Sequence, residues 1–96
     1  MYVVIFRARV RQLDPEYASM AAQLRGRALE QFGCLAFHAV TEGDAEIALS
    51  YWPDLDSIRA WKADAEHLDA QRLGRQRWYD AYEVQIAQVM REYRHP

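Results

Sequence analysis

The chain has 96 residues, 51% of them hydrophobic, and its 12 basic and 14 acidic side chains leave a formal net charge of −2. This length predicts a single domain spanning residues 1–96, and the apolar fraction is typical of a folded chain rather than a disordered one. The near balance of charge gives no general attraction to nucleic acid or to an anionic membrane, and no apolar run approaches the ~20 residues that span a bilayer.

Cysteine usage and the first residues indicate a reducing compartment. Cys34 stands alone, which excludes an intrachain disulfide and the paired cysteines of zinc sites. We expect it to be a small buried hydrophobe. The first ten residues, MYVVIFRARV, show neither a basic leader nor a cleavage site. We therefore expect a cytoplasmic protein.

The first third of the chain predicts a strand followed by a helix. Residues 2–10 are rich in β-branched and aromatic side chains, which is typical of a strand. Asp14 followed by Pro15 predicts a helix start, because the carboxylate can cap free N–H groups and proline suits the first turn. Apolar residues then recur with the period of an amphipathic helix that ends near Gly33.

The middle of the chain predicts a β-hairpin. Residues 34–41 form the second predicted strand, residues 42–44 (Glu-Gly-Asp) a tight turn, and residues 46–52 the third strand.

A second helix and a fourth strand complete the pattern. Pro53 ends the third strand and Asp54 opens a helix with an apolar stripe at Ile58, Trp61, Ala65 and Leu68. A basic, aromatic segment follows, and residues 82–93 predict the last strand. The order βαββαβ predicts an α+β, ferredoxin-like fold, in which two helices cover one face of an antiparallel four-stranded sheet.

The predicted strands are apolar on both faces. Leu35, Phe37 and Ala39 alternate with Cys34, Ala36 and Val40. Two helices cover only one face of the sheet, and an uncovered apolar face would be larger than soluble monomers usually tolerate. We therefore expect a homodimer with the two sheets packed together. The alternative is a monomer with a few exposed apolar residues.

Residues 50–79, SYWPDLDSIRAWKADAEHLDAQRLGRQRWY, and the later run YEVQIAQVMREY resemble the antibiotic biosynthesis monooxygenase family in its small stand-alone bacterial form. The resemblance covers nearly the whole chain and implies a dimeric α/β barrel built from two ferredoxin-like halves. Characterised members of that family include cofactor-free oxygenases of aromatic polyketides and enzymes that degrade haem. The resemblance therefore implies an oxidoreductase, a monooxygenase without a bound cofactor.

The residues that match the family favour one of these activities over the other. Trp61 matches a helix tryptophan that lines the pocket in several members. Haem-degrading members also use a first-strand asparagine and a histidine about three turns after the tryptophan. This chain has Arg7 and Arg9 on the first strand, no asparagine, and Gln71 ten residues after Trp61. His67 follows Trp61 by six residues, ~600° of helix rotation, and so leaves its face. Haem degradation is therefore disfavoured.

Cofactor-free oxygenation needs a substrate that forms an electron-rich carbanion or phenolate and then reduces oxygen itself. The protein must supply an apolar pocket, a base and donors for a developing oxyanion. We predict Trp61 and His67 as catalytic residues, with His67 or His38 as the base. The predicted substrate-binding residues, as pocket walls or as contacts to an anionic oxygen, are Phe37, His38, Tyr51, Arg75, Trp78 and Tyr79.

Each candidate also has a structural interpretation. Trp61 lies on an apolar stripe and could be a core residue, and His67 could belong to a solvated helix face. His38 could be a hydrogen-bonded core histidine, and Arg75 could belong to a solvated basic face. Three scattered histidines provide no metal-binding motif.

Two classes of function remain open. One is a small oxygenase that acts on an aromatic or quinone-like compound without a cofactor. The other is a non-catalytic dimer that binds a small molecule or has a structural role. A cavity beside Trp61 with His67 or His38 on its wall would favour the enzyme, and a packed interior would favour the second class.

Overall fold

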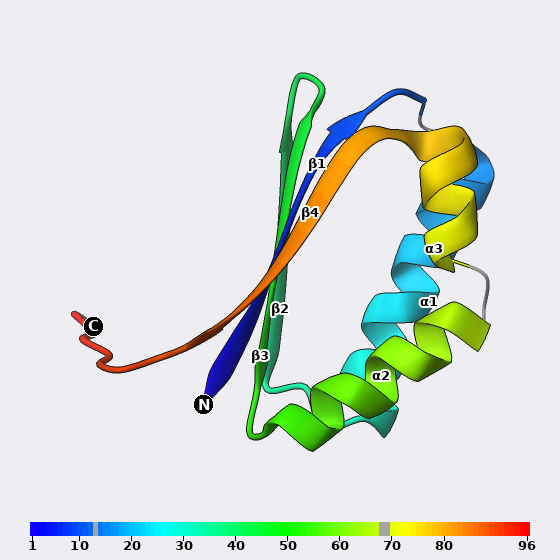
Figure 1. Ribbon diagram of the computed structural model, residues 1–96. Coiled ribbons are helices and arrows are strands. Elements are labelled where there is room, and N and C mark those ends of the chain that lie inside the picture. The colour runs from blue at the N-terminus through cyan, green and yellow to red at the C-terminus, as the bar shows by residue number, and fades with distance from the viewer. Residues whose placement is uncertain (13, 68–69) are drawn as a thin grey trace.

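The structure is a computed structural model that describes residues 1–12, 14–67 and 70–96, without the side chains of residues 66, 67, 70 and 71. All helices lie on one side of the sheet (Figure 1). The elements in chain order are β1 (Tyr2–Val10), α1 (Pro15–Gln31), β2 (Ala36–Glu42), β3 (Ala45–Trp52), α2 (Leu55–His67), α3 (Ala70–Leu73), the π-helical turn η1 (Gly74–Trp78) and β4 (Tyr79–Gln88).

The four strands form one antiparallel sheet in the order β2-β3-β1-β4. The predicted α+β, ferredoxin-like arrangement is thereby confirmed. None of the described helices is long and apolar enough to cross a membrane.

Two predicted strands had wrong boundaries, and one segment had no predicted structure. The second strand begins at Ala36 rather than at Cys34, because the Cys34 N–H turns back to the carbonyl of Ala28 (3.0 Å). The last strand is Tyr79–Gln88 rather than residues 82–93, since β4 pairs antiparallel with β1, from Val10 opposite Tyr79 to Tyr2 opposite Gln88. The segment before β4, predicted only as basic and aromatic, forms α3 and η1.

Both helix starts follow the predicted capping chemistry. The Asp14 Oδ1 atom accepts the backbone N–H of Tyr17 at 2.8 Å, and Asp54 Oδ1 accepts that of Ser57 at 2.7 Å. Helix α1 stops at Gln31, and Gly33 then takes a φ of 81°, a left-handed conformation that costs glycine little.

The two long helices are joined side by side. The Arg27 guanidinium donates two hydrogen bonds to the Asp64 carboxylate, at 2.7 Å from Nε and 2.6 Å from Nη2. Such a two-point contact fixes orientation as well as distance. It therefore holds α2 against α1 above the sheet.

The core lies between the sheet and the helices. Trp52 is fully buried and packs with Val4, Ala28 and Ile58. Cys34 joins this cluster, as predicted, and burial raises the pKa of its thiol. A buried thiol with a raised pKa is a poor nucleophile, so Cys34 has a packing role.

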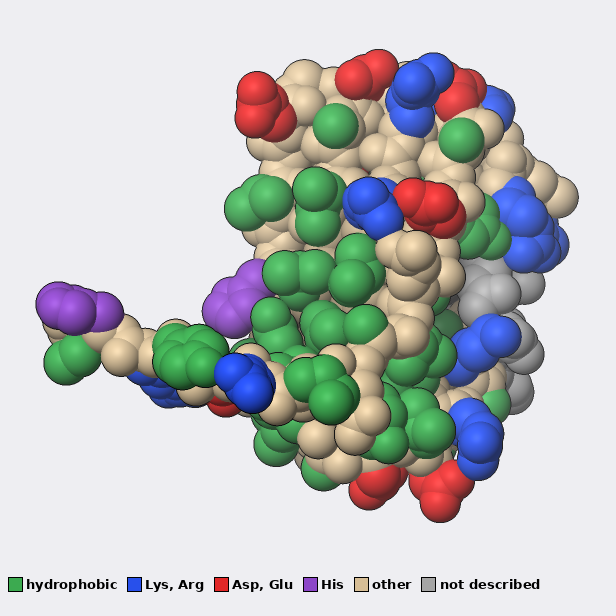
Figure 2. All heavy atoms as spheres, turned by 60° about the vertical axis from the view of Figure 1, so that its left-hand side comes forward, with side chains coloured by type: hydrophobic (Ala, Val, Ile, Leu, Met, Phe, Trp, Pro, Cys, Tyr) green, Lys and Arg blue, Asp and Glu red, His purple; other side chains and the backbone are tan. Residues whose placement is uncertain are grey.

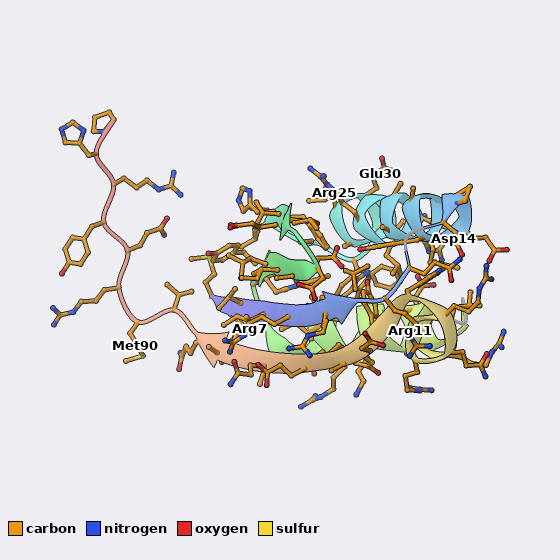
Figure 3. All side chains as sticks on the ribbon, turned by 90° about the horizontal axis from the view of Figure 1, so that it is seen from above. Arg7, Arg11, Asp14, Arg25, Glu30 and Met90 are labelled. Atoms are coloured by element: carbon orange, nitrogen blue, oxygen red, sulfur yellow. The ribbon has the colours of Figure 1, made fainter. Side chains whose placement is uncertain are left out.

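The opposite face of the sheet is apolar and no described helix covers it (Figure 2). Strand alternation places Val3, Ile5 and Leu49 on this face. Val40 on β2 is 68% exposed. Residues 89–96 continue beyond β4 and run away from the sheet, and Met90 is 82% exposed (Figure 3). The expectation of a dimer rests on the uncovered apolar face of the sheet.

Candidate functional site

A cavity of about 950 Å³ lies between the helices and the sheet. This volume is in the range of small-molecule sites, and like them the cavity is mostly apolar. Val84 and Ile86 of β4 line it and are each 53% exposed, so the cavity opens to solvent beside β4. Its other walls include Phe6, Met20, Leu24, Phe37, Ile58, Trp61, Trp78 and Tyr79.

Tryptophan and phenylalanine rings form one end of the cavity. Trp61 packs against Trp52, with ring centroids 5.2 Å apart, and edge-to-face against Phe37 at 6.2 Å. Its indole N–H donates to the carbonyl of Leu24 at 3.1 Å, which ties α2 to α1. Trp61 is thus both a partner of the core and a wall of the cavity.

A hydrogen-bonded chain of two tyrosines and a glutamate forms the other end. The Tyr17 hydroxyl donates to Oε1 of Glu46, and the Tyr79 hydroxyl lies 3.3 Å from that of Tyr17. The second carboxylate oxygen of Glu46 is buried, and no hydrogen-bond donor reaches it within the described part of the chain. Tyr17 also stacks on Trp78, with centroids 5.4 Å apart.

Burial keeps both tyrosines in this chain neutral. Desolvation, followed by the hydrogen bond to Glu46, raises the pKa of Tyr17 to about 12. Desolvation, followed by the hydrogen bond with Tyr17, also raises the pKa of Tyr79. A phenol with a raised pKa is a poor base near neutrality, so these hydroxyls act as hydrogen-bonding groups.

Two irregularities of the backbone direct Tyr79 into the cavity. In η1 the backbone N–H of Tyr79 donates to the carbonyl of Gly74, and a Cβ atom on Gly74 would come within 3.1 Å of the Tyr79 ring. In β4, Tyr79 lies opposite Val10 but Ala81 lies opposite Arg9, so one extra residue makes a β-bulge. The bulge lets Tyr79 face the helices although Ala81, two residues later, faces away. Both irregularities are common beside functional sites.

Arg11 holds this bulge from outside. Its guanidinium donates to the Asp80 carboxylate at 2.9 Å and to the backbone carbonyls of Tyr79 at 3.2 Å and Gln76 at 3.3 Å. One exposed side chain therefore bridges the turn and the start of the strand.

The cavity brings together Phe37, Trp61, Trp78 and Tyr79 from the predicted site. They come from β2, α2, η1 and β4, and the fold alone makes them neighbours. Their roles remain predictions.

The other predicted site residues lie elsewhere. The proposed place of His38 and Tyr51 on the pocket wall is corrected: both face away from the helices, with ring centroids 6.3 Å apart, because their neighbours Phe37 and Trp52 face the core. His38 is exposed, so it is not a core histidine either. Arg75 is exposed and donates to the Tyr82 hydroxyl at 3.4 Å. The His67 side chain lies outside the described residues.

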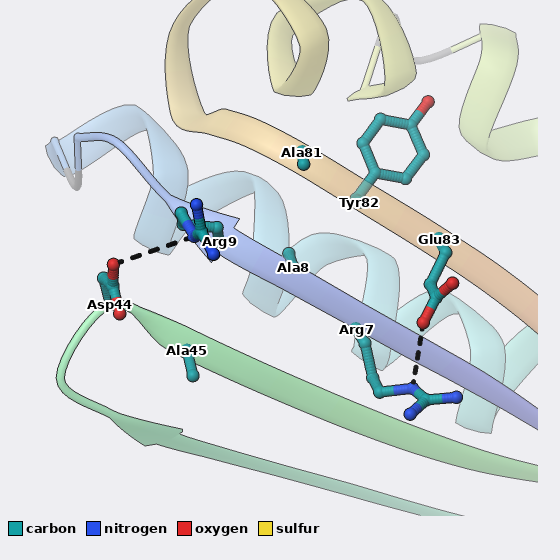
Figure 4. Close-up of a pocket in the computed structure, with 8 residues that line it drawn as sticks. All are labelled: Arg7, Ala8, Arg9, Asp44, Ala45, Ala81, Tyr82 and Glu83. Atoms are coloured by element: carbon teal, nitrogen blue, oxygen red, sulfur yellow. Dashed lines mark ion pairs between the residues drawn. The ribbon is translucent and has the colours of Figure 1, made fainter.

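A shallower hollow of about 430 Å³ lies on the other face of the sheet (Figure 4). Arg7 pairs there with Glu83 at 3.4 Å, and Arg9 with Asp44 at 4.0 Å. Exposed pairs of this kind contribute little energy. Among the described residues, no group of three or more His, Cys, Asp or Glu side chains is placed to hold a metal ion.

Solved structures with this fold include oxygenases. A variant of SnoaB, a cofactor-independent oxygenase from Streptomyces nogalater, matches with a TM-score of 0.77 and 18% identity, over 95% of this chain and 94% of that one. An antibiotic biosynthesis monooxygenase matches with a TM-score of 0.66 and 17% identity, over 95% of this chain and 100% of that one. Rv0793 from Mycobacterium tuberculosis matches with a TM-score of 0.77 and 11% identity, over 95% of this chain and 96% of that one. At these identities the likeness establishes the fold.

The protein therefore has the ferredoxin-like fold of antibiotic biosynthesis monooxygenases, as the sequence resemblance implied. No family model matches the chain. The uncharacterized protein YqjZ of Bacillus subtilis is 36% identical over 92 residues, which cover 95% of this chain and 81% of that protein. The chain belongs to the same family as YqjZ.

Proposed function

We propose that the protein is a cofactor-independent monooxygenase that acts on a small aromatic or quinone-like substrate. The observation that carries this proposal is the cavity of about 950 Å³, which has aromatic walls and a hydrogen-bonding group at one end. The fold shared with the oxygenase SnoaB supports the same reaction class. The fold contains a cavity beside Trp61 rather than a packed interior; His38 does not line it, and the His67 side chain lies outside the described residues.

In such a reaction the substrate supplies the electrons. Loss of a proton gives a carbanion or phenolate, which transfers electrons to dioxygen. One oxygen atom then forms a bond to carbon, the O–O bond breaks, and the other oxygen leaves as water with two hydrogens lost by the substrate. The apolar walls at Trp61 and Phe37 would hold a planar ring and exclude water from the reactive anion. His67 remains the predicted base.

Oxygen consumption tests this proposal. Purified protein is mixed with a panel of anthrone-type and hydroquinone compounds in an oxygen electrode, with heat-denatured protein as the control. We expect protein-dependent uptake for at least one compound, and mass spectrometry with isotopically labelled dioxygen should place one labelled atom in the product. Ligand binding without uptake across the panel would instead support the non-catalytic, small-molecule-binding class.

A further inference from the structure

We propose that the Tyr79–Tyr17–Glu46 chain is a recognition site for the neutral hydroxyl group of an aromatic ligand. Tyr79 accepts a hydrogen bond from that hydroxyl, and Glu46 sets the direction of the chain. The inference rests on the proposed function for the aromatic class of the ligand, and it adds which polar group the ligand carries and where that group binds.

The direction of the hydrogen bonds follows from the number of protons available. The Glu46 carboxylate has none to donate, so the Tyr17 hydroxyl donates to it. Tyr17 has only one hydroxyl proton, so the 3.3 Å contact between the two tyrosines must be a donation from Tyr79 to Tyr17. Both O–H groups therefore point toward Glu46.

The free end of this chain is consequently an acceptor. Tyr79 lines the cavity, and the one hydroxyl close to its oxygen among the described residues, that of Tyr17, donates its proton to Glu46 instead. This oxygen can accept a further hydrogen bond within a mostly apolar cavity, so a ligand O–H placed here would be stabilising. An ether or a hydrocarbon of the same shape would leave the acceptor unused.

The charges around the cavity disfavour the alternative of an anionic ligand oxygen at this end. Glu46 is an acidic wall residue there, and the basic wall residues of the described chain, Arg25 and Lys62, belong to the other end. Arg25 lies over the ring of Phe37, 5.9 Å from its centroid, and Lys62 follows Trp61 on α2. A carboxylate or phenolate at Tyr79 would thus face the Glu46 carboxylate, while Arg75, the cation beside Tyr82, is exposed and donates to the Tyr82 hydroxyl.

Three naphthalene probes of similar size separate these possibilities. Titration calorimetry compares 2-naphthol with 2-methoxynaphthalene, which lacks the donor, and with 2-naphthoate, which is anionic. We expect the wild type to bind 2-naphthol about tenfold more tightly than either, the size of effect that one or two hydrogen bonds produce. Equal binding of naphthol and its methyl ether, or no binding of naphthol up to its solubility limit, would overturn the proposal.

Three variants test whether this preference comes from the hydrogen-bonded Tyr79–Tyr17–Glu46 chain. Tyr79→Phe keeps the ring and should reduce naphthol binding to the level of the ether, with the ether changed less than about twofold. Glu46→Gln should lessen the discrimination against 2-naphthoate. Tyr82→Phe is the matched control, because Tyr82 also lines the cavity but its hydroxyl contacts the exposed Arg75. It should keep the full preference.

Thermal melts show that each variant is folded, and Tyr17→Phe replaces Tyr79→Phe if the latter unfolds. A naphthol preference that survives Tyr79→Phe refutes the proposal, and so does an undiminished preference in Tyr17→Phe, where the Tyr79 proton is free to be donated to the ether. The two proposals fail in different ways. A naphthol preference without oxygen uptake would refute the oxygenase activity and support the hydroxyl-recognition site. Oxygen uptake without the preference would support the oxygenase activity and refute the recognition site.

Discussion

Trp61 is expected to serve stability and ligand binding at once, and Trp61→Phe measures both. The substitution removes the indole N–H that donates to Leu24 at 3.1 Å, worth about 1 kcal/mol. It also removes roughly 40 Å² of apolar contact area beside Trp52, worth about another 1 kcal/mol. For a domain of this size a loss of about 2 kcal/mol lowers Tm by roughly 8–16 °C.

Trp52→Phe is the comparison that separates the two roles. Trp52 is fully buried, donates its indole N–H to Ser50 Oγ at 2.9 Å, and does not line the cavity. Trp52→Phe should therefore destabilise the fold by at least as much as Trp61→Phe does. Differential scanning fluorimetry gives the two Tm values, and calorimetry with 2-naphthol gives the two affinities.

We expect Trp61→Phe to weaken naphthol binding about fivefold or more, because a wall of the cavity recedes. Trp52→Phe should weaken naphthol binding less than Trp61→Phe does, because Trp52 does not line the cavity. If both variants lose the same affinity, the loss of binding follows from the lower stability of the fold, and Trp61 has no specific role in binding. A Tm unchanged by Trp61→Phe would refute the packing estimate instead.

Three further outcomes are expected. Because Val40 and its neighbours leave one sheet face apolar, light scattering at micromolar concentration should give about twice 11.3 kDa, and a monomer mass would remove the dimer. Gly74→Ala should shift the ring of Tyr79 and reduce the naphthol preference, and an unchanged preference would contradict this expectation. The hydrogen bond from the Tyr17 backbone N–H lowers the pKa of the Asp14 carboxyl below 3.8 in the folded state. The ionised carboxylate therefore stabilises the fold above pH 3.8, and this stabilisation is lost as the pH falls through the lowered pKa. Asp14→Asn keeps a cap and should flatten the acid limb of the Tm–pH curve; an acid limb as steep as that of the wild type would argue against this assignment.

The secondary structure was predictable because its signals are local. Asp14 and Asp54 mark helix starts by capping chemistry within three residues, and the strands show dense β-branched and aromatic runs. The turn η1 gave no such signal, because a π-helical turn has neither the helical nor the strand period. It was therefore predicted only as a basic, aromatic segment.

The faces of the strands were harder to assign than the strands themselves. Tyr51 and Trp52 are adjacent and both aromatic, yet one faces the uncovered side and the other is fully buried. Where apolar residues occupy both faces, alternation does not show which set meets the helices. His38 and Tyr51 were placed in the pocket for this reason.

The tyrosine end of the cavity was missed altogether. Tyr17 reads as a helix residue on an apolar stripe, and Glu46 as a charged residue beside a tight turn, where exposure is the usual expectation. They meet across 29 positions of sequence, and only the fold brings them into contact. The one available signal was an acidic residue at a position of β3 whose alternate neighbours, Ala48 and Ser50, face the helices.

The extra residue opposite Val10 has a consequence for how relatives are compared. Because β4 contains one residue more than β1 at this point, the alternation after Ala81 does not extend back to Tyr79. A relative without the bulge would carry its cavity tyrosine one position closer to the residue that corresponds to Ala81. An alignment without a gap at Asp80 would then match Tyr79 to a side chain on the wrong side of the sheet. Within this family, the length of the segment between Trp78 and Ala81 is therefore as informative as the residues it contains.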